Sequence, residues 1–386
     1  MKAKEEYILW LPSWYPNKFE PFNGDFIQRH AQATSLYCKI VVGHFPQLSE
    51  SVRIDEPSTE IHSDNNLKEL IHYCKFIPTG IKPFDRLRYN YLYYKQTLKF
   101  LKEYFNDHGL PKLVHVHIPV KAGNIALWIK KKYKIGYIVS EQTSLYLEGA
   151  PDSFSKRSFI YQNQVRNVFK RALLATNVSK TIGELLLTKF DLPEIATVHN
   201  TVDTDLFYIS KEKKETFTFI HVSSFSNQKN IIGIFKAFSE YKKCRTDWKL
   251  QMIGPYTEQV VKYIDDFELA DHVELLGTKS YMQVAAYMKS ANVFVLFSLY
   301  ENFPCVIVEA LCCGLPVVSA DVAGIKEAIN DENGILVEMR NEIELLEAIK
   351  KIHNEYNSYD LEMIASKASS VYNYREIGRQ FFNLYK

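Results

Sequence analysis

The sequence predicts an α/β protein made of two doubly wound domains, each with a parallel sheet covered by helices. At 386 residues, the chain is longer than an ordinary single domain. Short runs of β-branched residues alternate with longer helical patterns throughout, and this alternation is typical of βαβ units. Most strand runs are apolar on both faces, which favours parallel sheets over antiparallel ones.

The first domain is expected to span residues 1–205, and the polar, irregular residues 45–70 within it are expected to form loops. The second domain is expected to span residues 206–372, followed by a helix over about 373–386 that crosses back to the first domain. The charge-dense stretch 211–215 marks the boundary. The expected strands are 7–11, 39–44, 113–118, 137–141, 175–179, 218–224, 250–254, 273–277, 293–298 and 316–320.

Charge is unevenly distributed along a chain of ordinary globular composition, with 46% hydrophobic and 24% charged residues. Residues 1–205 carry 27 Lys and Arg against 21 Asp and Glu, whereas residues 206–386 carry 20 against 24. A modestly basic first half suits an anionic ligand or an acidic membrane surface, although a chance excess of surface lysines explains it equally well. We expect no nucleic-acid partner.

The cysteines and the apolar runs favour a cytoplasmic protein. The six cysteines show no CxxC spacing, and four of them lie in apolar runs, where free cysteine behaves as a small buried hydrophobe. The apolar run near the N-terminus is too short for a signal peptide, and no stretch approaches about 18 apolar residues. We therefore expect a cytoplasmic chain, attached at most to the inner face of the cytoplasmic membrane.

Two glutamates stand in the otherwise apolar stretch 298–329. In open α/β sheets, ligands bind beyond the carboxyl ends of strands, over helix N-termini. Glu301 lies in the loop after the strand 293–298, and Glu309 lies in the helix that follows Pro304. A second helix is expected from Ile325. Its N-terminus and that of the first helix would then converge on one cleft and offer backbone N–H groups to an anion.

Carboxylates beside an anion would repel it, so we expect them to bind something neutral that accompanies the anion. An ionised carboxylate accepts hydrogen bonds from two sugar hydroxyls. A diphosphate with a ribose at one end and a transferable hexose at the other meets both demands. The alternative is that the two glutamates only stabilise helix dipoles.

These motifs resemble those of the retaining family 4 glycosyltransferases. The pattern E-x7-E, followed by A-L-x-x-G-x-P-V-V and G-x-x-E, carries the resemblance most specifically, and other matching stretches follow one another in the same order over nearly the whole chain: 13–33, 113–123, 198–207, 221–230 and 372–386. The resemblance implies a GT-B fold, with two Rossmann-like domains facing across a cleft. It also implies transfer of a hexose from a nucleotide-diphosphate sugar to a hydroxyl of a glycan or lipid-linked glycan, in cell-surface polysaccharide or lipopolysaccharide biosynthesis.

Site residues are carried over from the resemblance by matching position. It implies that Glu301 meets the hydroxyls of the donor hexose, that Glu309 binds the ribose and that Lys229 binds the diphosphate. His117 would contact the donor sugar near its reacting carbon, so His117, Lys229 and Glu301 are the expected catalytic residues. The further donor-binding residues are Gly24, Ser224, Asn302, Phe303 and Pro304, and the acceptor-binding residues are Glu141, Gln142 and Thr143.

The chain departs from the family pattern at Ser224, where the family usually has an arginine. A single ammonium at Lys229 cannot make the bidentate grip of a guanidinium. Either helix dipoles and another cation compensate, or diphosphate binding is weaker than usual. No metal or other cofactor is expected. Asp203 and Asp205 form a D-x-D pattern, but they lie in the passage between domains, and His115 and His117 lack a third ligand at suitable spacing.

Retention is expected to proceed by front-face attack, in which the departing phosphate oxygen takes the acceptor proton and the protein supplies positioning and charge stabilisation. Two other readings stay open. One is a sugar-nucleotide 2-epimerase of the same fold, and the other is an inactive relic that binds a nucleotide sugar, for which Ser224 is the only support. The basic and aromatic segment 81–105 either touches lipid or packs on its own domain.

Overall fold

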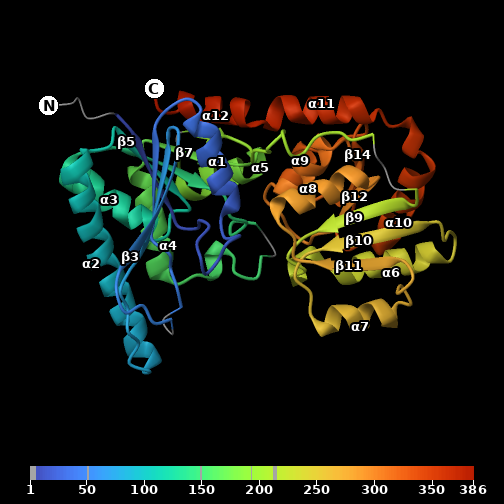
Figure 1. Cartoon of the computed structure of the whole chain (residues 1–386), viewed down its shortest axis with the longest axis horizontal. Coiled ribbons are helices and arrows are strands. Elements are labelled where there is room, and N and C mark those ends of the chain that lie inside the picture. Colours follow the sequence, from blue (N-terminus) through green and yellow to red (C-terminus); the bar gives the residue numbers. More distant parts are fainter. Residues whose placement is uncertain (1–5, 50–51, 148–149, 193, 212–214) are drawn as a thin grey trace.

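The computed structural model describes residues 6–49, 52–147, 150–192, 194–211 and 215–386. It contains two separate sheets, one in each half of the chain, and the helices α11 and α12 run across both halves along one edge of the molecule (Figure 1). These two units are called the N-terminal and C-terminal domains below. The predicted α/β fold with two Rossmann-like domains is confirmed. Of the expected boundary stretch 211–215, residues 212–214 lie outside the described residues.

The N-terminal sheet has eight strands in the order β3-β4-β2-β1-β5-β6-β7-β8. All neighbours are parallel except β3 and β4, which form an antiparallel hairpin. The strands are β1 (Ile8–Pro12), β2 (Ile40–His44), β3 (Ser58–Asp64), β4 (Leu67–Tyr73), β5 (Leu113–His117), β6 (Tyr137–Glu141), β7 (Leu174–Asn177) and β8 (Ile195–Thr197), and the helices are α1 (Asp25–Ser35), α2 (Lys82–His108), α3 (Ala122–Tyr133), η1 (Phe154–Lys156), α4 (Phe159–Arg171) and α5 (Lys180–Phe190).

The expectation that residues 45–70 form loops was wrong, because β3 and the start of β4 lie within this range. β3 is the edge strand of the sheet, and most of its side chains are exposed, so it carries no apolar run. In β4, Lys68 and Glu69 interrupt the buried Leu67, Leu70 and Ile71. A mostly solvated edge hairpin therefore resembles a loop when only hydrophobicity is considered.

The C-terminal sheet has six parallel strands in the order β11-β10-β9-β12-β13-β14. The central strands β12 and β13 are buried throughout, as expected for strands covered by helices on both faces. The strands are β9 (Phe217–Val222), β10 (Trp248–Ile253), β11 (Val273–Gly277), β12 (Val293–Leu296), β13 (Val317–Ala320) and β14 (Gly334–Val337). The helices are η2 (Asn227–Lys229), α6 (Ile231–Lys242), α7 (Glu258–Asp266), α8 (Tyr281–Ser290), α9 (Cys305–Cys312), η3 (Ala323–Glu327), α10 (Glu342–Asn354), η4 (Tyr356–Ser358), α11 (Leu361–Tyr372) and α12 (Tyr374–Asn383).

The helix α12 packs on α1 of the N-terminal domain (Figure 1). Their backbones touch at Gly378, where an added Cβ would lie only 2.0 Å from the carbonyl oxygen of Ala33. The side chains of Ile377, Phe381 and Tyr385 are buried in the same cluster as Trp10. The last helix therefore completes a core that the first strand begins.

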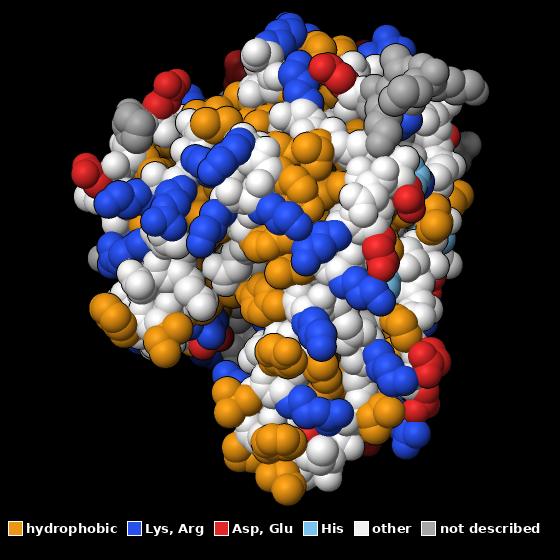
Figure 2. Space-filling view, turned by 90° about the vertical axis from the view of Figure 1, so that its left-hand side faces the viewer, with side chains coloured by type: hydrophobic (Ala, Val, Ile, Leu, Met, Phe, Trp, Pro, Cys, Tyr) orange, Lys and Arg blue, Asp and Glu red, His pale blue; other side chains and the backbone are white. Residues whose placement is uncertain are grey.

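One face of the N-terminal domain is strongly basic. Figure 2 shows many Lys and Arg side chains and few Asp and Glu on the side formed by α2 and α3, with apolar side chains toward its lower end. At the start of α2, the side chains of Phe84, Leu87 and Tyr91 are exposed. Within the described residues, no helix combines the length and the apolarity needed to cross a bilayer.

Candidate functional site

A cavity of about 780 Å³ opens between the two domains. Its walls follow the carboxyl ends of β1 and β6 on one side and of β9 and β12 on the other, where open α/β sheets bind ligands. The N-terminal domain contributes Trp14, Asp25, Phe26, Gln142, Thr143, Ser144, Leu145, Ala150, Pro151, Asp152 and Arg157, the connecting passage contributes Asn200, and the C-terminal domain contributes Val222, Ser223, Ser224, Gln228, Lys229, Tyr300, Glu301, Asn302, Phe303, Pro304, Cys305 and Val306.

Lys229 and Glu301 form an ion pair in the wall of this cavity. Lys229 ends η2 after β9, and Glu301 follows β12. Because β9 and β12 are parallel neighbours, the segments that follow them emerge side by side. Lys229 Nζ lies 2.5 Å from Glu301 Oε1, and the Glu301 carboxylate is buried. The pair offers a cation to an anionic ligand and a carboxylate to hydroxyl groups.

The loop after Glu301 is held by hydrogen bonds to residues that precede the C-terminal domain in the sequence. The Ser179 hydroxyl donates a hydrogen bond to Asn302 Oδ1 at 2.7 Å, and Asn302 Nδ2 donates to the Thr143 carbonyl oxygen at 3.3 Å. The Asn200 side chain donates to the Phe303 carbonyl oxygen at 2.6 Å. These contacts place Asn302, Phe303 and Pro304 at the cavity, where they were predicted to lie. Pro304 is the N-cap of α9, so the free N–H groups of this helix face the same region.

The prediction of a second helix from Ile325 was wrong. The structure has the short 3₁₀ helix η3 there, because the chain must return to the sheet as β14 at Gly334. Gly324 packs against the loop, since an added Cβ would lie 2.1 Å from the Asn302 carbonyl oxygen. Glu327 points to the N-terminal domain and accepts the backbone N–H groups of Lys180 and Thr181, both at 2.9 Å. η3 therefore supports the loop and caps α5 across the domain boundary.

Glu309 lies behind the cavity wall. It is in the middle of α9, its residue is 3% exposed, and Oε1 lies 3.7 Å from Nη2 of Arg29 on α1. Burial raises the pKa of Glu309 to about 7, and the Arg29 guanidinium opposes that rise. Arg29 was not predicted to be a site residue, because only the tertiary arrangement brings α1 against α9. Its spacing of four residues from Asp25, to which it donates at 2.9 Å, is the only local signal.

His117 is fully buried at the carboxyl end of β5, beneath the cavity rather than in its lining. Its ring lies 4.1 Å from that of Trp10, and its nitrogens have no hydrogen-bond partner among the described residues. Burial and the neighbouring His115 and His30 hold the pKa of His117 well below its usual range, so its imidazole is neutral. His115 is a satisfied core histidine, bonded to Tyr385 at 2.6 Å and to Ser140 at 2.7 Å.

Of the three predicted acceptor residues, Gln142 and Thr143 line the cavity and Glu141 does not. Glu141 is buried at the end of β6, and its carboxylate accepts the backbone N–H groups of Gln142 and Thr143 at 2.9 Å and the Tyr146 hydroxyl at 2.8 Å. Burial raises the pKa of Glu141 while these hydrogen bonds oppose the rise. Its contacts hold the turn that presents its two neighbours.

Gly24 and Ser224 occupy opposite sides of the site. Gly24 has φ of 69° and caps α1 directly behind Trp14, where an added Cβ would lie 2.6 Å from backbone atoms. Gly24 does not line the cavity, whereas its neighbour Asp25 does. Ser224 lines it, so this position supplies a hydroxyl and no cation. Arg157 was not predicted from the sequence. It adds a guanidinium to the N-terminal wall of the cavity, with its Nη2 3.5 Å from Asp152 Oδ2.

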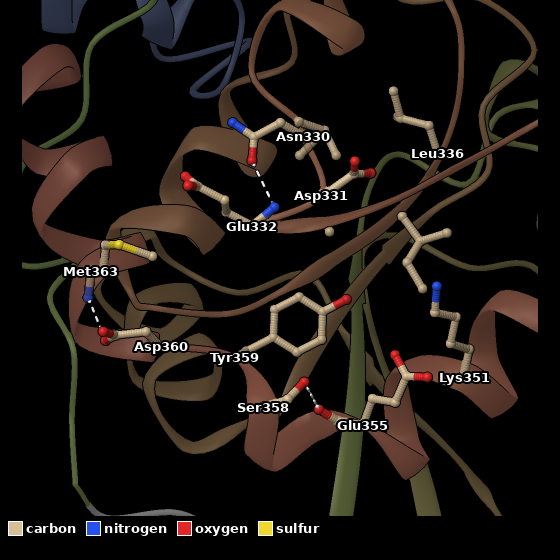
Figure 3. A pocket seen from close by; sticks show the side chains of 13 residues that line it. Asn330, Asp331, Glu332, Leu336, Lys351, Glu355, Ser358, Tyr359, Asp360 and Met363 are labelled. Carbon is tan, nitrogen blue, oxygen red and sulfur yellow. Dashed lines mark hydrogen bonds between the residues drawn. The ribbon is translucent and has the colours of Figure 1, made fainter.

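The described residues hold no group of three or more His, Cys, Asp or Glu side chains placed to bind a metal ion. In the passage between domains, Asp203 stabilises a turn, since its carboxylate accepts a hydrogen bond from the Asp205 backbone N–H at 3.0 Å. Figure 3 shows another pocket, of about 470 Å³, in the C-terminal domain. It is lined by Asp331, Glu332, Glu355, Asp360 and Lys351 among others and includes none of the predicted site residues.

Two family models match adjacent parts of the chain. Residues 55–206 match the model described as Glycosyltransferase Family 4, and residues 203–368 match the model described as Glycosyl transferases group 1. The two matches meet within the passage that contains Asp203 and Asp205, and together they include most of the residues that line the cavity.

Curated proteins with similar sequences carry glycosyltransferase names. An uncharacterized glycosyltransferase of Methanocaldococcus jannaschii is 27% identical over 63% of this chain and 65% of its own length. A Bacillus subtilis glycosyltransferase whose name assigns it to teichuronic acid biosynthesis is 23% identical over 90% of this chain and 89% of its own length. The chain spans less than two thirds of the length of the first three curated relatives that it matches, namely 65%, 41% and 55%.

Solved structures share the fold over nearly the full length. Sucrose-phosphate synthase from Thermosynechococcus elongatus superposes with a TM-score of 0.77 at 17% identity, covering 98% of each chain. The Anabaena protein HepE in complex with UDP-glucose superposes with a TM-score of 0.70 at 16% identity, also covering 98% of each chain. At such identities the likeness establishes the arrangement of the two domains.

Proposed function

Because this chain belongs to the glycosyl transferases of group 1, family 4, and has their GT-B fold, we propose that it transfers a hexose from a nucleotide-diphosphate sugar to a hydroxyl acceptor with retention of configuration. The acceptor is a glycan or a lipid-linked glycan of the cell surface. The observation that carries the proposal is the Lys229–Glu301 pair in the wall of a cavity at the carboxyl ends of both sheets.

We assign each residue of the cavity a role in sugar transfer from the chemistry of its side chain. The Lys229 ammonium offsets the charge that develops on the leaving diphosphate, together with the N–H groups at the start of α9. Glu301 accepts hydrogen bonds from hydroxyls of the donor hexose. The neutral His117 is fully buried beneath the cavity, so its proposed contact with the same sugar requires the cavity floor to open. No residue is needed as a nucleophile when the departing phosphate oxygen takes the acceptor proton on the same face of the sugar. The mechanism then uses no metal or other cofactor.

Two comparisons support the choice of substrates. A protein of the same fold is known in complex with UDP-glucose, which supports a nucleotide-sugar donor. The Bacillus relative that matches 90% of this chain is named for an envelope polysaccharide, which supports a surface glycan as the product. Gln142 and Thr143, on the N-terminal wall, are the proposed contacts of the acceptor. Trp14, which is 40% exposed at the cavity, offers an aromatic surface beside them.

The same proposal places the basic face of the N-terminal domain against the cytoplasmic side of an anionic bilayer. Phe84, Leu87 and Tyr91 share one side of α2 at helical spacing and are 54%, 73% and 64% exposed. Exposed basic residues accompany them along α2, namely Lys82, Arg86, Lys95, Lys99 and Lys102. Apolar side chains with basic residues around them suit a lipid interface. A lipid-linked acceptor would then lie in the membrane to which the protein is bound.

Vesicle flotation tests this contact. The protein should float with vesicles that contain phosphatidylglycerol and not with pure phosphatidylcholine, and Leu87→Ser should weaken flotation. Ile343→Ser is the matched control, because Ile343 is 76% exposed on α10 of the other domain. If Leu87→Ser floats like the wild-type protein, or if the wild-type protein does not float, the proposed contact is refuted.

A nucleotide panel followed by product analysis tests the reaction. UDP, GDP, ADP, dTDP and CMP are added singly during thermal unfolding. A ligand at ~100 times its dissociation constant stabilises a protein by about 2.7 kcal/mol, which is a shift of several degrees. The sugar donors of the nucleotide that binds are then supplied with envelope glycan acceptors, and NMR of the new linkage reports retention. A changed sugar without any acceptor would identify an epimerase, and binding of no nucleotide would refute the proposal.

A further inference from the structure

One buried ion pair joins the two domains directly behind the cavity. Arg29 lies on α1 of the N-terminal domain, Glu309 lies on α9 of the C-terminal domain, and Nη2 of the arginine is 3.7 Å from Oε1 of the glutamate. The two side chains are 8% and 4% exposed. A buried charge of this kind is costly unless it is paired. Glu309 depends on the other domain for its cation, whereas Arg29 also pairs with Asp25 of its own helix.

The Arg29 guanidinium is held by three side chains: Glu309, Asp25 and Tyr281. Its Nη1 donates to Asp25 Oδ2 at 2.9 Å, and its central carbon lies 4.7 Å from the ring centroid of Tyr281. α1 itself is held by α12 through the close approach at Gly378. The titratable groups that face Glu309 are Arg29 and Asp25 from α1, Tyr281 from α8, Tyr374 from α12, and Cys305 and Cys312 from its own helix. Arg29 is the only cation in that set of described residues.

We propose that Arg29 is a positioning residue for the nucleotide: it presents Glu309 to the ribose as an oriented, ionised carboxylate, and it does so only while α1 lies against α9. The inference rests on the proposed function, in which Glu309 binds the ribose. It adds a residue of the opposite domain to the donor site. Nucleotide affinity and the approach of the two domains then become coupled through one contact.

The ionisation of Glu309 is the quantity that Arg29 controls. An ionised carboxylate accepts hydrogen bonds from both ribose hydroxyls, whereas a protonated one has a donor in place of one acceptor site. Burial raises the pKa of Glu309 to about 7 even with Arg29 present, and loss of the guanidinium would raise it further. The wild-type protein should therefore lose nucleotide affinity as the pH falls through about 7. Without Arg29, the same loss should begin at higher pH.

Binding of UDP and of 2′-deoxy-UDP to Arg29→Met, compared with wild type over a range of pH, tests the inference. Should another nucleoside diphosphate of the panel bind better, it and its 2′-deoxy form replace the UDP pair. A hydrogen bond to a charged group is worth about 1.5–3 kcal/mol, so affinity for UDP should fall about tenfold or more at about pH 7. Affinity for the 2′-deoxy form should change much less. Because buried glutamates titrate up to about pH 8–9, the preference for ribose should return as the pH is raised.

Three further variants keep the test decisive. Arg29→Lys keeps the charge and should keep most of the ribose preference. Arg166→Met removes an arginine from the exposed side of α4 and should change nothing. Glu309→Gln cannot ionise, so its preference for UDP over 2′-deoxy-UDP should be independent of pH even if Arg29→Met does not fold; the terminal phosphate, which itself titrates at about pH 6, is the same in both ligands. An unchanged ribose preference in Arg29→Met, or a ribose preference in Glu309→Gln that varies with pH as in the wild-type protein, would overturn this inference and leave the proposed function standing. Absence of nucleotide binding in the wild-type protein would instead overturn the proposed function.

Discussion

Replacing Lys229 by methionine removes the charge and keeps most of the length of the side chain, so its effects on the stability of the C-terminal domain and on sugar transfer can be measured separately. Lys229 Nζ lies 2.5 Å from Glu301 Oε1, and the two side chains are 16% and 8% exposed. Removing one partner of a fully buried pair costs about 3–5 kcal/mol. Since both groups keep some contact with solvent, we expect roughly 2 kcal/mol, which corresponds to a melting temperature lower by about 4–8 °C.

The effect on transfer should be larger than the effect on stability. Losing one group that stabilises transition-state charge lowers a rate by about 10²–10³, and Ser224 supplies no second cation on the C-terminal wall. The double variant Lys229→Met with Glu301→Gln removes both charges, so it should regain most of the melting temperature and none of the transfer rate. Thermal unfolding and initial rates of transfer are measured on the same preparations.

Lys236→Met is the matched control. Lys236 pairs with Glu342 at 3.6 Å on the surface, where its side chain is 54% exposed, so neither the melting temperature nor the rate should change appreciably. A Lys229→Met protein that is folded and transfers sugar at the wild-type rate would refute the diphosphate role of Lys229. A double variant as unstable as the single one would refute the explanation of the stability loss by an unpaired Glu301.

Three further predictions concern stability, each measured by thermal unfolding. Gly24→Ala should cost at least ~1–2 kcal/mol because its φ of 69° is left-handed, and an unchanged melting temperature would show that the turn can relax. Gly378→Val should lower the melting temperature strongly, since the Cβ would lie 2.0 Å from the Ala33 carbonyl oxygen; Val371→Ala, exposed on α11, is the control. Acidification should destabilise the protein. Burial lowers the pKa of His30 and His115 to about 3, below the unfolded value of about 6.5, so each favours unfolding by ~1.4 kcal/mol per pH unit as the pH falls below 6.5. A melting temperature that stays constant from about pH 7 to 5 would contradict this linkage.

The sequence allowed prediction of those parts of the site that local pattern determines. β12, the loop with Glu301 and the helix α9 follow one another as an apolar run, a polar loop and a second apolar run, with Pro304 at one end of the helix and Gly314 past the other. Lys229 was carried over from the family resemblance, and the structure places it at the end of η2, after β9. Its place just after a strand agrees with the rule that ligand-facing residues of parallel sheets follow the strands.

Features that depend on tertiary contact could not be predicted in this way. Arg29 and Glu309 are far apart in the sequence, and nothing local to either residue indicates the other. η3 is a helical turn of five residues because β14 must re-enter the sheet soon after it, and β14 carries only a short apolar signal. The hairpin of β3 and β4 was missed because an edge strand can be polar when its neighbour supplies its hydrogen bonds.

The packing of α12 on α1 has a consequence for the order in which the chain is synthesised. Domains generally fold from the N-terminus as they leave the ribosome. Here Ile377, Phe381 and Tyr385, which are buried beside Trp10, emerge only after the whole C-terminal sheet. The N-terminal domain therefore cannot complete this core until α12 has been translated, and until then the surface of α1 that α12 covers remains exposed to solvent.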